Sequence, residues 1–267
     1  MSMGRIYMDN AATSFPKPPA VWEAVNRYAA EIGASAGRGA YREAIESAHV
    51  LQECRLRLQK LFNGERPEHF IFTLNCSDAL NIAIKGLVLY QLRKGIRPHC
   101  ICTQIDHNSV LRPYRAMEEL GWITHTCVPI DRKTGLVDPD EIRKAITPQT
   151  RVIAVTHASN VTGTLQPLRK LAAVAREHGI PLVVDAAQSA GHVPIDVQAD
   201  GIDFLAMPGH KGLLGPLGTG VLYVRPGMEK IMLPLREGGT GSVSEQPVQP
   251  EFMPDFLESG SHIAVGI

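Results

Sequence analysis

The chain has 267 residues, of which 44% are hydrophobic and 20% charged, and its 27 basic residues balance its 27 acidic ones. This length can bury a substantial core, and the lack of a basic stripe argues against binding of nucleic acid or of a membrane surface. No apolar run is long enough to span a bilayer, and the first residues do not predict a signal peptide. The five cysteines are few and odd in number, which favours a reducing, cytoplasmic location.

Short apolar segments rich in β-branched residues alternate with segments that carry apolar residues at helical spacing. The expected strands are residues 69–74, 99–104, 151–159, 181–188, 203–209 and 218–226. Helices are expected at 47–62, at 77–92 and in the runs SVLRPYRAMEELG and LRKLAAVAREHG. Continuously apolar strands are typical of sheets covered on both faces, so the pattern predicts a doubly wound α/β fold with a mostly parallel sheet. The stretch 238–255 is expected to be a long loop.

The run HCICTQ raises the question of a metal site. Strand geometry would place Cys100 and Cys102 on one face and His99 on the other. No second pair of ligands with the spacing of a zinc site follows. We therefore expect no metal and interpret both cysteines as buried strand residues.

Polar side chains follow five of the expected strands, where ligands of open α/β sheets bind. In chain order these are Asn75, Cys76, Ser77, Asp106, His107, Asn160, Asp185, Gln188, His210 and Lys211. Each also has an ordinary explanation. Asp185 or Ser77 could cap a helix, Gln188 could lie on a helix surface, and His107 and Lys211 could be solvated loop residues. Their shared position at strand ends favours one common site.

Pyridoxal phosphate would account for this set of residues. It needs a lysine for covalent attachment, an acid beside its ring nitrogen, a flat side chain against the ring and donors for its phosphate at a helix N-terminus. Lys211, Asp185, His107 and Ser77 would supply these groups in turn. The glycines that follow Lys211 do not form the nucleotide-binding pattern G-x-x-x-x-G-K-[ST].

Five segments together resemble the class V aminotransferases of fold type I, in particular their cysteine desulfurase and selenocysteine lyase branch. They are YMDNAATSFPKP, SNVTGTLQP, VVDAAQSAGHVPIDV, DFLAMPGHKGLLGPLGTG and ESGSHIAVGI. The resemblance runs from residue 7 to residue 267. The D-A-x-Q and G-H-K motifs are its most specific parts.

The resemblance implies a role for each matching position. Lys211 would form the Schiff base with the cofactor, Asp185 would pair with the ring nitrogen, and His107 would stack on the ring and move protons. The positions that would bind the remaining parts of the cofactor are Asn160, Gln188, Cys76, Ser77 and His210, with Thr240 and Ser261 completing the site of the partner subunit in a homodimer. Asn10, Ala11 and Arg38 would lie near the substrate.

Two departures from the family pattern stand out. Pro208 occupies a position where a serine hydroxyl usually precedes G-H-K, and NCSDAL replaces the usual run at the phosphate site. The family continues into a small C-terminal domain with a sulfur-accepting cysteine and an arginine that binds the substrate carboxylate. No cysteine of this chain matches that position. We expect residues 1–20 to form a segment near the site, 21–250 the cofactor-binding domain, and 251–267 the start of a connection to an absent domain.

The resemblance implies an enzyme that converts L-cysteine, or L-selenocysteine, to L-alanine and passes sulfur to an acceptor protein. Two alternatives remain open. The chain could be a class V aminotransferase or lyase that acts on another small amino acid, or a non-catalytic fragment that binds the cofactor. As it stands, we expect it to bind the cofactor but to turn over L-cysteine slowly or not at all.

Overall fold

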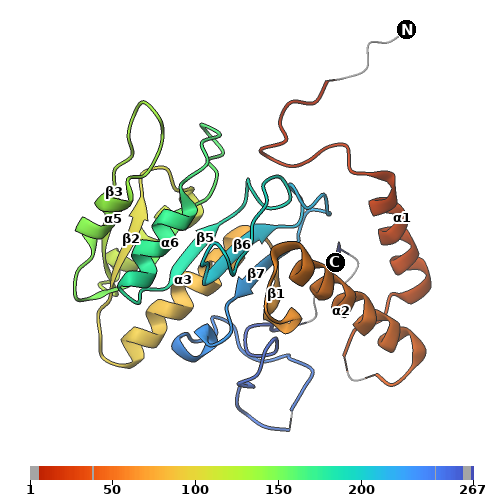
Figure 1. The fold of residues 1–267 in the computed structure, drawn as a ribbon. Helices are drawn as coiled ribbons and strands as arrows, with labels where there is room; N and C mark the ends of the chain where they lie inside the picture. Colours follow the sequence, from red (N-terminus) through yellow and green to blue (C-terminus); the bar gives the residue numbers. More distant parts are fainter. Residues whose placement is uncertain (1–5, 38, 244, 261–265) are drawn as a thin grey trace.

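The computed structural model describes residues 6–37, 39–243, 245–260 and 266–267. Within these residues, seven strands form one sheet in the order β1-β7-β6-β5-β4-β2-β3 (Figure 1). The strands are β1 Phe70–Thr73, β2 His99–Thr103, β3 Thr124–Val128, β4 Thr150–Thr156, β5 Leu182–Asp185, β6 Phe204–Pro208 and β7 Gly220–Val224. Only β7 is antiparallel to its neighbours, so the other six strands end at the same edge of the sheet. The predicted mostly parallel, doubly wound α/β fold is confirmed.

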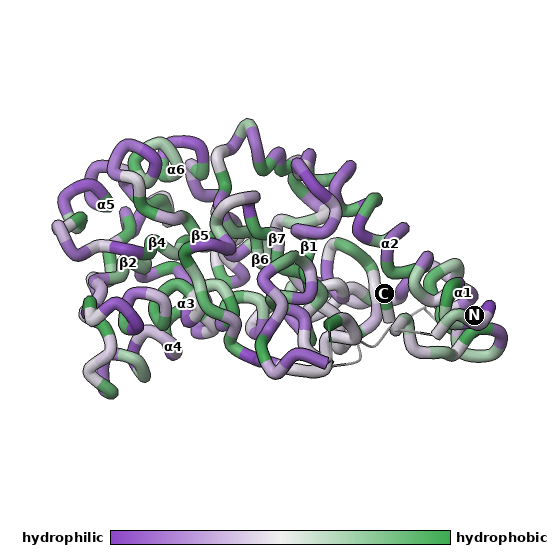
Figure 2. The backbone as a smooth tube through the Cα atoms, turned by 90° about the horizontal axis from the view of Figure 1, so that it is seen from below, coloured by the Kyte–Doolittle hydropathy of each residue, from purple (hydrophilic) through white to green (hydrophobic). Residues whose placement is uncertain are grey.

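The helices cover both faces of this sheet. They are α1 Pro19–Arg27, α2 Arg42–Phe62, α3 Cys76–Arg93, α4 Asn108–Glu119, α5 Pro139–Ala145 and α6 Leu168–Glu177, and a π-helical segment, Tyr28–Ile32, follows α1. Figure 2 shows α2, α5 and α6 on one side of the sheet and α3 and α4 on the other. Because side chains alternate along a strand, Phe70 and Phe72 of β1 pack toward α2 while Ile71 packs toward α3. Each face of the sheet therefore has its own apolar core.

The expected strands at 69–74, 99–104, 151–159, 203–209 and 218–226 are confirmed with shifted ends, whereas the segment 181–188 is strand only over β5. The sequence did not predict β3, whose residues at the sheet edge are exposed or half-buried except for Val128 and lack a continuous apolar run. Gly179 has a φ of +63° directly after α6, as its predicted place at a helix end requires. Residues 238–243 and 245–255 form neither helix nor strand, in agreement with the predicted loop.

The HCICTQ segment carries two buried cysteines and a histidine whose two ring nitrogens are both hydrogen-bonded. Cys100 and Cys102 are fully buried among the residues that face α3 and α4. His99 is hydrogen-bonded through Nδ1 to Thr150 at 2.8 Å and through Nε2 to Thr126 at 2.9 Å. Among the described residues, no three His, Cys, Asp or Glu side chains are arranged to hold a metal ion. No described helix has the length and apolar character needed to cross a membrane.

Candidate active site

A cavity of about 120 Å³ lies at the edge of the sheet where the parallel strands end. We call it the sheet-edge cavity. Its lining comes from five strand-end segments and comprises Asn75, Cys76, Ser77, Leu80, His107, Ser109, Thr156, Ala158, Asn160, Asp185, Ala187, Gln188, Pro208, His210 and Lys211. Nine of the ten polar residues that the sequence placed after the strands are thus brought together, all except Asp106: Asn75, Cys76, Ser77, His107, Asn160, Asp185, Gln188, His210 and Lys211. The shared direction of the strands is the physical reason.

Asp185 is the last residue of β5 and only 2% exposed. Its Oδ1 accepts hydrogen bonds from the backbone N–H of Ala187 at 2.9 Å and from the thiol of Cys76 at 3.6 Å. Burial raises the pKa of this carboxyl, against the lowering effect of these donors and of the charges of His107 and Lys211. The residues that follow β5 form turns, so Asp185 does not cap a helix and Gln188 does not lie on one.

The N-terminus of α3 points at the same cavity. Its cap is Asn75, whose side chain accepts a hydrogen bond from the backbone N–H of Asp78 at 2.9 Å, so the alternative in which Ser77 is the cap is wrong. The hydroxyl of Ser77 is 2.6 Å from that of Ser109. Gly220 at the start of β7 packs against this turn so closely that a Cβ would lie 2.5 Å from the carbonyl carbon of Asn75. A helix N-terminus with hydroxyl groups is suited to bind an anion.

His107 and Ser109 form the other hydroxyl-bearing side of the cavity. His107 is the cap of α4, and its Nδ1 accepts a hydrogen bond from the backbone N–H of Ser109 at 3.2 Å. A neutral His107 ring therefore carries its proton on Nε2. The hydroxyl of Ser109 lies 2.9 Å from the same Nδ1. Sequence reasoning missed Ser109, although a hydroxyl residue two places after a strand-end histidine was a usable signal.

The buried carboxylate of Asp106 fixes the position of His107. Its two oxygens accept backbone N–H hydrogen bonds from Thr103 at the end of β2, at 2.6 Å, and from Thr156 at the end of β4, at 2.5 Å. Burial raises the pKa of Asp106 to about 7, even though both N–H groups favour the charged form. Asp106 thus ties two neighbouring strand ends together beside the cavity.

Lys211 follows β6 in a loop whose backbone path requires glycine at position 212. A Cβ on Gly212 would lie 2.2 Å from the carbonyl oxygen of Ala190, and one on Gly191 would lie 2.3 Å from the carbonyl oxygen of Gly212. This close backbone contact holds the Lys211 loop against the turn after β5. Lys211 is half-buried, and it lines the cavity with Asp185.

The N-terminal segment packs against this loop. Four donors approach the carbonyl oxygen of His210: the backbone N–H and hydroxyl of Ser14, the hydroxyl of Thr13 and the ammonium of Lys17, the last at 2.6 Å. Ala11 accepts a hydrogen bond from Gln188 Nε2 at 2.9 Å.

Of the remaining predicted site residues, Asn10 and Ala11 stand apart from the cavity lining. The side chain of Asn10 accepts a hydrogen bond from the backbone N–H of Phe15 at 3.3 Å. Ala11 touches Gln188, as described, yet neither Asn10 nor Ala11 lines the cavity. Arg38 and Ser261, which the sequence also singled out, lie outside the described residues.

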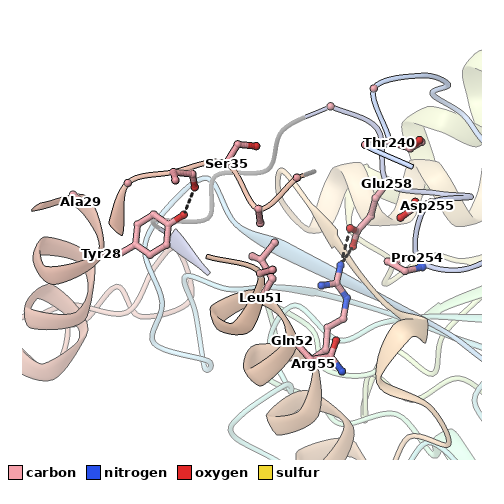
Figure 3. A pocket seen from close by; sticks show the side chains of 18 residues that line it. Tyr28, Ala29, Ser35, Leu51, Gln52, Arg55, Thr240, Pro254, Asp255 and Glu258 are labelled. Atoms are coloured by element: carbon pink, nitrogen blue, oxygen red, sulfur yellow. Dashed lines mark hydrogen bonds and ion pairs between the residues drawn. The ribbon is translucent and has the colours of Figure 1, made fainter. Parts of the chain in front are cut away.

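A second and larger cavity, of about 680 Å³, lies between α2, the loop before it and the C-terminal segment (Figure 3). We call it the α2 cavity. Thr240 lines it, and so does a buried ion pair in which the guanidinium of Arg55 lies 2.5 Å and 2.6 Å from the two carboxylate oxygens of Glu258. The structure therefore does not bring Thr240 to the sheet-edge cavity.

Comparison with known proteins places this arrangement in a family. The family model described as Aminotransferase class-V matches residues 6–267. The chain belongs to the class V aminotransferases. Members of this family use pyridoxal phosphate, and an amine, a buried carboxylate and a helix N-terminus with hydroxyls around one cavity are the groups that this cofactor requires.

Individual relatives narrow the likeness within the class V family. The chain is 38% identical to a probable cysteine desulfurase of Methanothermobacter thermautotrophicus, over 96% of this chain and 62% of the relative. It superposes on the apo structure of a cysteine desulfurase from Thermococcus onnurineus NA1 with a TM-score of 0.86 and 32% identity, over 98% of this chain and 64% of that one. A structure described as SspA in complex with cysteine gives a TM-score of 0.86 at 30% identity, over 98% and 70%. The chain thus spans about 60% of the length of the curated relatives it matches.

Proposed function

We propose that the chain is the cofactor-binding part of a cysteine desulfurase, which binds pyridoxal phosphate in the sheet-edge cavity and acts on L-cysteine to release sulfur and L-alanine. The observation that carries the proposal is that Lys211, Asp185, His107 and the N-terminus of α3 line one cavity. The names of the relatives support the choice of reaction, and the solved neighbour in complex with cysteine supports the choice of substrate.

Each residue would have a separate task in this reaction. The amine of Lys211 would hold the cofactor and then carry a proton to and from the α-carbon of the substrate. The carboxylate of Asp185 would pair with the ring nitrogen, and the N–H groups of α3 with Ser77 and His210 would bind the phosphate. When bound, pyridoxal phosphate supplies an electron sink that weakens the bonds at that α-carbon. Nε2 of His107 is the ring nitrogen left free to exchange protons in the cavity.

The alternative, an aminotransferase or lyase acting on another small amino acid, is supported by the state of the thiols. Burial raises the pKa of each of the five cysteines, at positions 54, 76, 100, 102 and 127. Of the five, only Cys76 lines the sheet-edge cavity, and its raised pKa disfavours the thiolate that would receive sulfur from a substrate. We therefore propose that this chain binds the cofactor well but turns over L-cysteine slowly.

Covalent labelling tests the cofactor site. The purified chain, mixed with pyridoxal phosphate, is expected to develop a visible absorbance band, and borohydride reduction followed by peptide mapping is expected to find the cofactor on Lys211. Lys211→Ala should abolish the label, whereas Lys17→Ala should keep it. Labelling of another lysine in the wild-type chain would overturn the assignment.

Product assays separate the candidate reactions. Sulfide and alanine are measured with L-cysteine, and transamination is measured with an amino acid and a keto acid. Asp185→Ala is expected to reduce either activity more than it reduces cofactor binding, because it removes the charge that keeps the ring an electron sink. Rapid sulfide release by the wild-type chain would show that one of its own thiols serves as acceptor.

A homodimer is part of the proposal. Thr240 lines the α2 cavity, away from Lys211, so it would serve a cofactor site only across a subunit interface, together with Ser261. A monomer by light scattering that still binds the cofactor tightly would count against this. An acceptor protein for the sulfur and a cytoplasmic location also belong to the proposal, and the five free cysteines support a reducing compartment.

A further inference from the structure

Cys76 is placed against Asp185 by the way α3 begins. It is the first residue of that helix, directly after the cap Asn75, and only 9% exposed. The contact between Gly220 and Asn75 leaves no room for a Cβ, so this turn lies directly on the start of β7. The Cys76 side chain thereby reaches the floor of the sheet-edge cavity, with its sulfur 3.6 Å from Asp185 Oδ1.

The two donors to Asp185 share one oxygen. The thiol of Cys76 and the backbone N–H of Ala187 both donate to Oδ1. Among the described residues, no side chain or backbone group donates to Oδ2. The carboxylate, itself 2% exposed, thus has one oxygen held by the protein and the other without a protein donor in a cavity that Asp185 lines.

We propose that Cys76 is a positioning residue for Asp185. The Cys76 thiol donates a hydrogen bond to Oδ1 of Asp185 and so reserves Oδ2 for the nitrogen of the cofactor ring. This inference rests on the proposed function. Burial and the neighbouring Asp185 charge raise the pKa of Cys76 far above its usual range, so the group remains a thiol and can act as a donor. The thiol then orients the carboxylate and favours its charged form.

Removal of the donor should change both the affinity for the cofactor and its pH dependence. Cys76→Ala is expected to raise the Kd for pyridoxal phosphate about five- to tenfold, the effect of one lost hydrogen bond of ordinary strength, because a thiol is a weak donor. Cys76→Ser keeps a hydroxyl donor and should restore the wild-type value. Cys100→Ala removes a thiol of comparable burial that faces the core, and it should leave the Kd unchanged.

The pH profile separates a positioning role from a purely structural one. The titratable groups that face Asp185 are Cys76 from α3, His107 and Asp106 from the end of β2 and the start of α4, and Lys211 from the loop after β6. Without the thiol the pKa of Asp185 should rise, so cofactor binding in Cys76→Ala should weaken at a higher pH on acidification than in wild type. Cys76→Ser should return the midpoint toward that of wild type. Protons on the free cofactor titrate equally in all variants, so a difference between their midpoints comes from the protein site.

The S–H stretching band gives a readout that needs neither cofactor nor the alanine variant. The infrared difference between wild type and Cys76→Ser isolates the Cys76 band, which a hydrogen bond to a carboxylate shifts to lower wavenumber. Asp185→Asn should move it back. The inference is overturned if this band lies where a free thiol absorbs, or if Cys76→Ala folds and matches wild type in Kd and pH midpoint while Asp185→Ala does not. If the wild-type chain binds no cofactor, or binds it without dependence on Asp185, the proposed function fails instead.

Discussion

The α2 cavity and the sheet-edge cavity differ in that the smaller of the two holds the chemically reactive groups. The α2 cavity is more than five times larger than the sheet-edge cavity, at about 680 Å³ against 120 Å³. Much of its described wall consists of glycine and alanine, and its buried charges, Arg55 and Glu258, neutralise each other. The smaller cavity gathers an amine, a carboxylate, an imidazole and hydroxyls from five strand ends. Chemistry follows from the convergence of functional groups, and volume alone does not reveal it.

The largest expected effect is on the free energy of unfolding and comes from a substitution in the wall of the α2 cavity. Arg55→Met breaks the buried ion pair between Arg55 and Glu258, so the free energy of unfolding in urea should fall by about 3–5 kcal/mol. Arg57→Met is the control. Arg57 lies two residues further along α2 in an exposed ion pair with Glu53, so this substitution should lower the free energy of unfolding by less than about 1 kcal/mol. Cofactor binding by the folded Arg55→Met protein should persist. Loss of binding without loss of stability would contradict the structural role of this pair.

Asp106, which lies beside the sheet-edge cavity, is expected to make the free energy of unfolding depend on pH. Its folded pKa of about 7 lies above the ordinary value of 3.8, so the folded protein keeps a proton that the unfolded chain loses. The free energy of unfolding should therefore fall as pH rises from about 4 to 7, by up to about 4 kcal/mol from this group. Asp106→Asn should remove this component of the slope. Equal slopes in both proteins would show that Asp106 is charged throughout.

Two glycine-to-alanine substitutions compare how tightly the backbone is packed beside each of the two cavities. Gly220→Ala brings a Cβ to 2.5 Å from the backbone of Asn75, and the forced shift of the α3 N-terminus should cost about 1–3 kcal/mol in thermal unfolding and weaken cofactor binding. Gly37→Ala, in the wall of the α2 cavity, meets nothing closer than 3.7 Å and should change neither. Similar losses in both variants would remove the distinction between the cavities.

The smallest expected effect concerns two serines. Ser109→Ala removes the hydroxyl that contacts both Ser77 and His107, and should weaken cofactor binding about two- to tenfold, as measured by absorbance titration. Ser35→Ala alters a hydroxyl in the α2 cavity and should have no effect on this titration. An effect of the same size from Ser35→Ala would point to a ligand in the larger cavity.

The site was predictable to the extent that strand ends could be recognised. Asp185, His107 and Lys211 each follow an apolar segment, and the common direction of parallel strands made their meeting a direct expectation. Ser109 and the contacts of Thr13 and Lys17 with His210 were not foreseen. These contacts depend on the backbone at the start of α4 and in the irregular N-terminal segment, and neither region has a periodic hydrophobic pattern in the sequence. The edge strand β3 was missed because exposure allows polar residues there.

The sequence by itself determined the α/β layering, the direction of most strands and the identity of the groups at the strand ends, because the alternation of apolar strands with amphipathic helices can be read along the chain. Only the tertiary structure decided which groups touch. The donation of two hydrogen bonds to one oxygen of Asp185, the bridge that Asp106 forms between β2 and β4, and the separation of Thr240 from Lys211 all depend on sub-ångström packing between segments distant in sequence. Such contacts are set by backbone approach at glycines such as Gly220 and Gly212, whose need for space appears only when the neighbouring segment is in place.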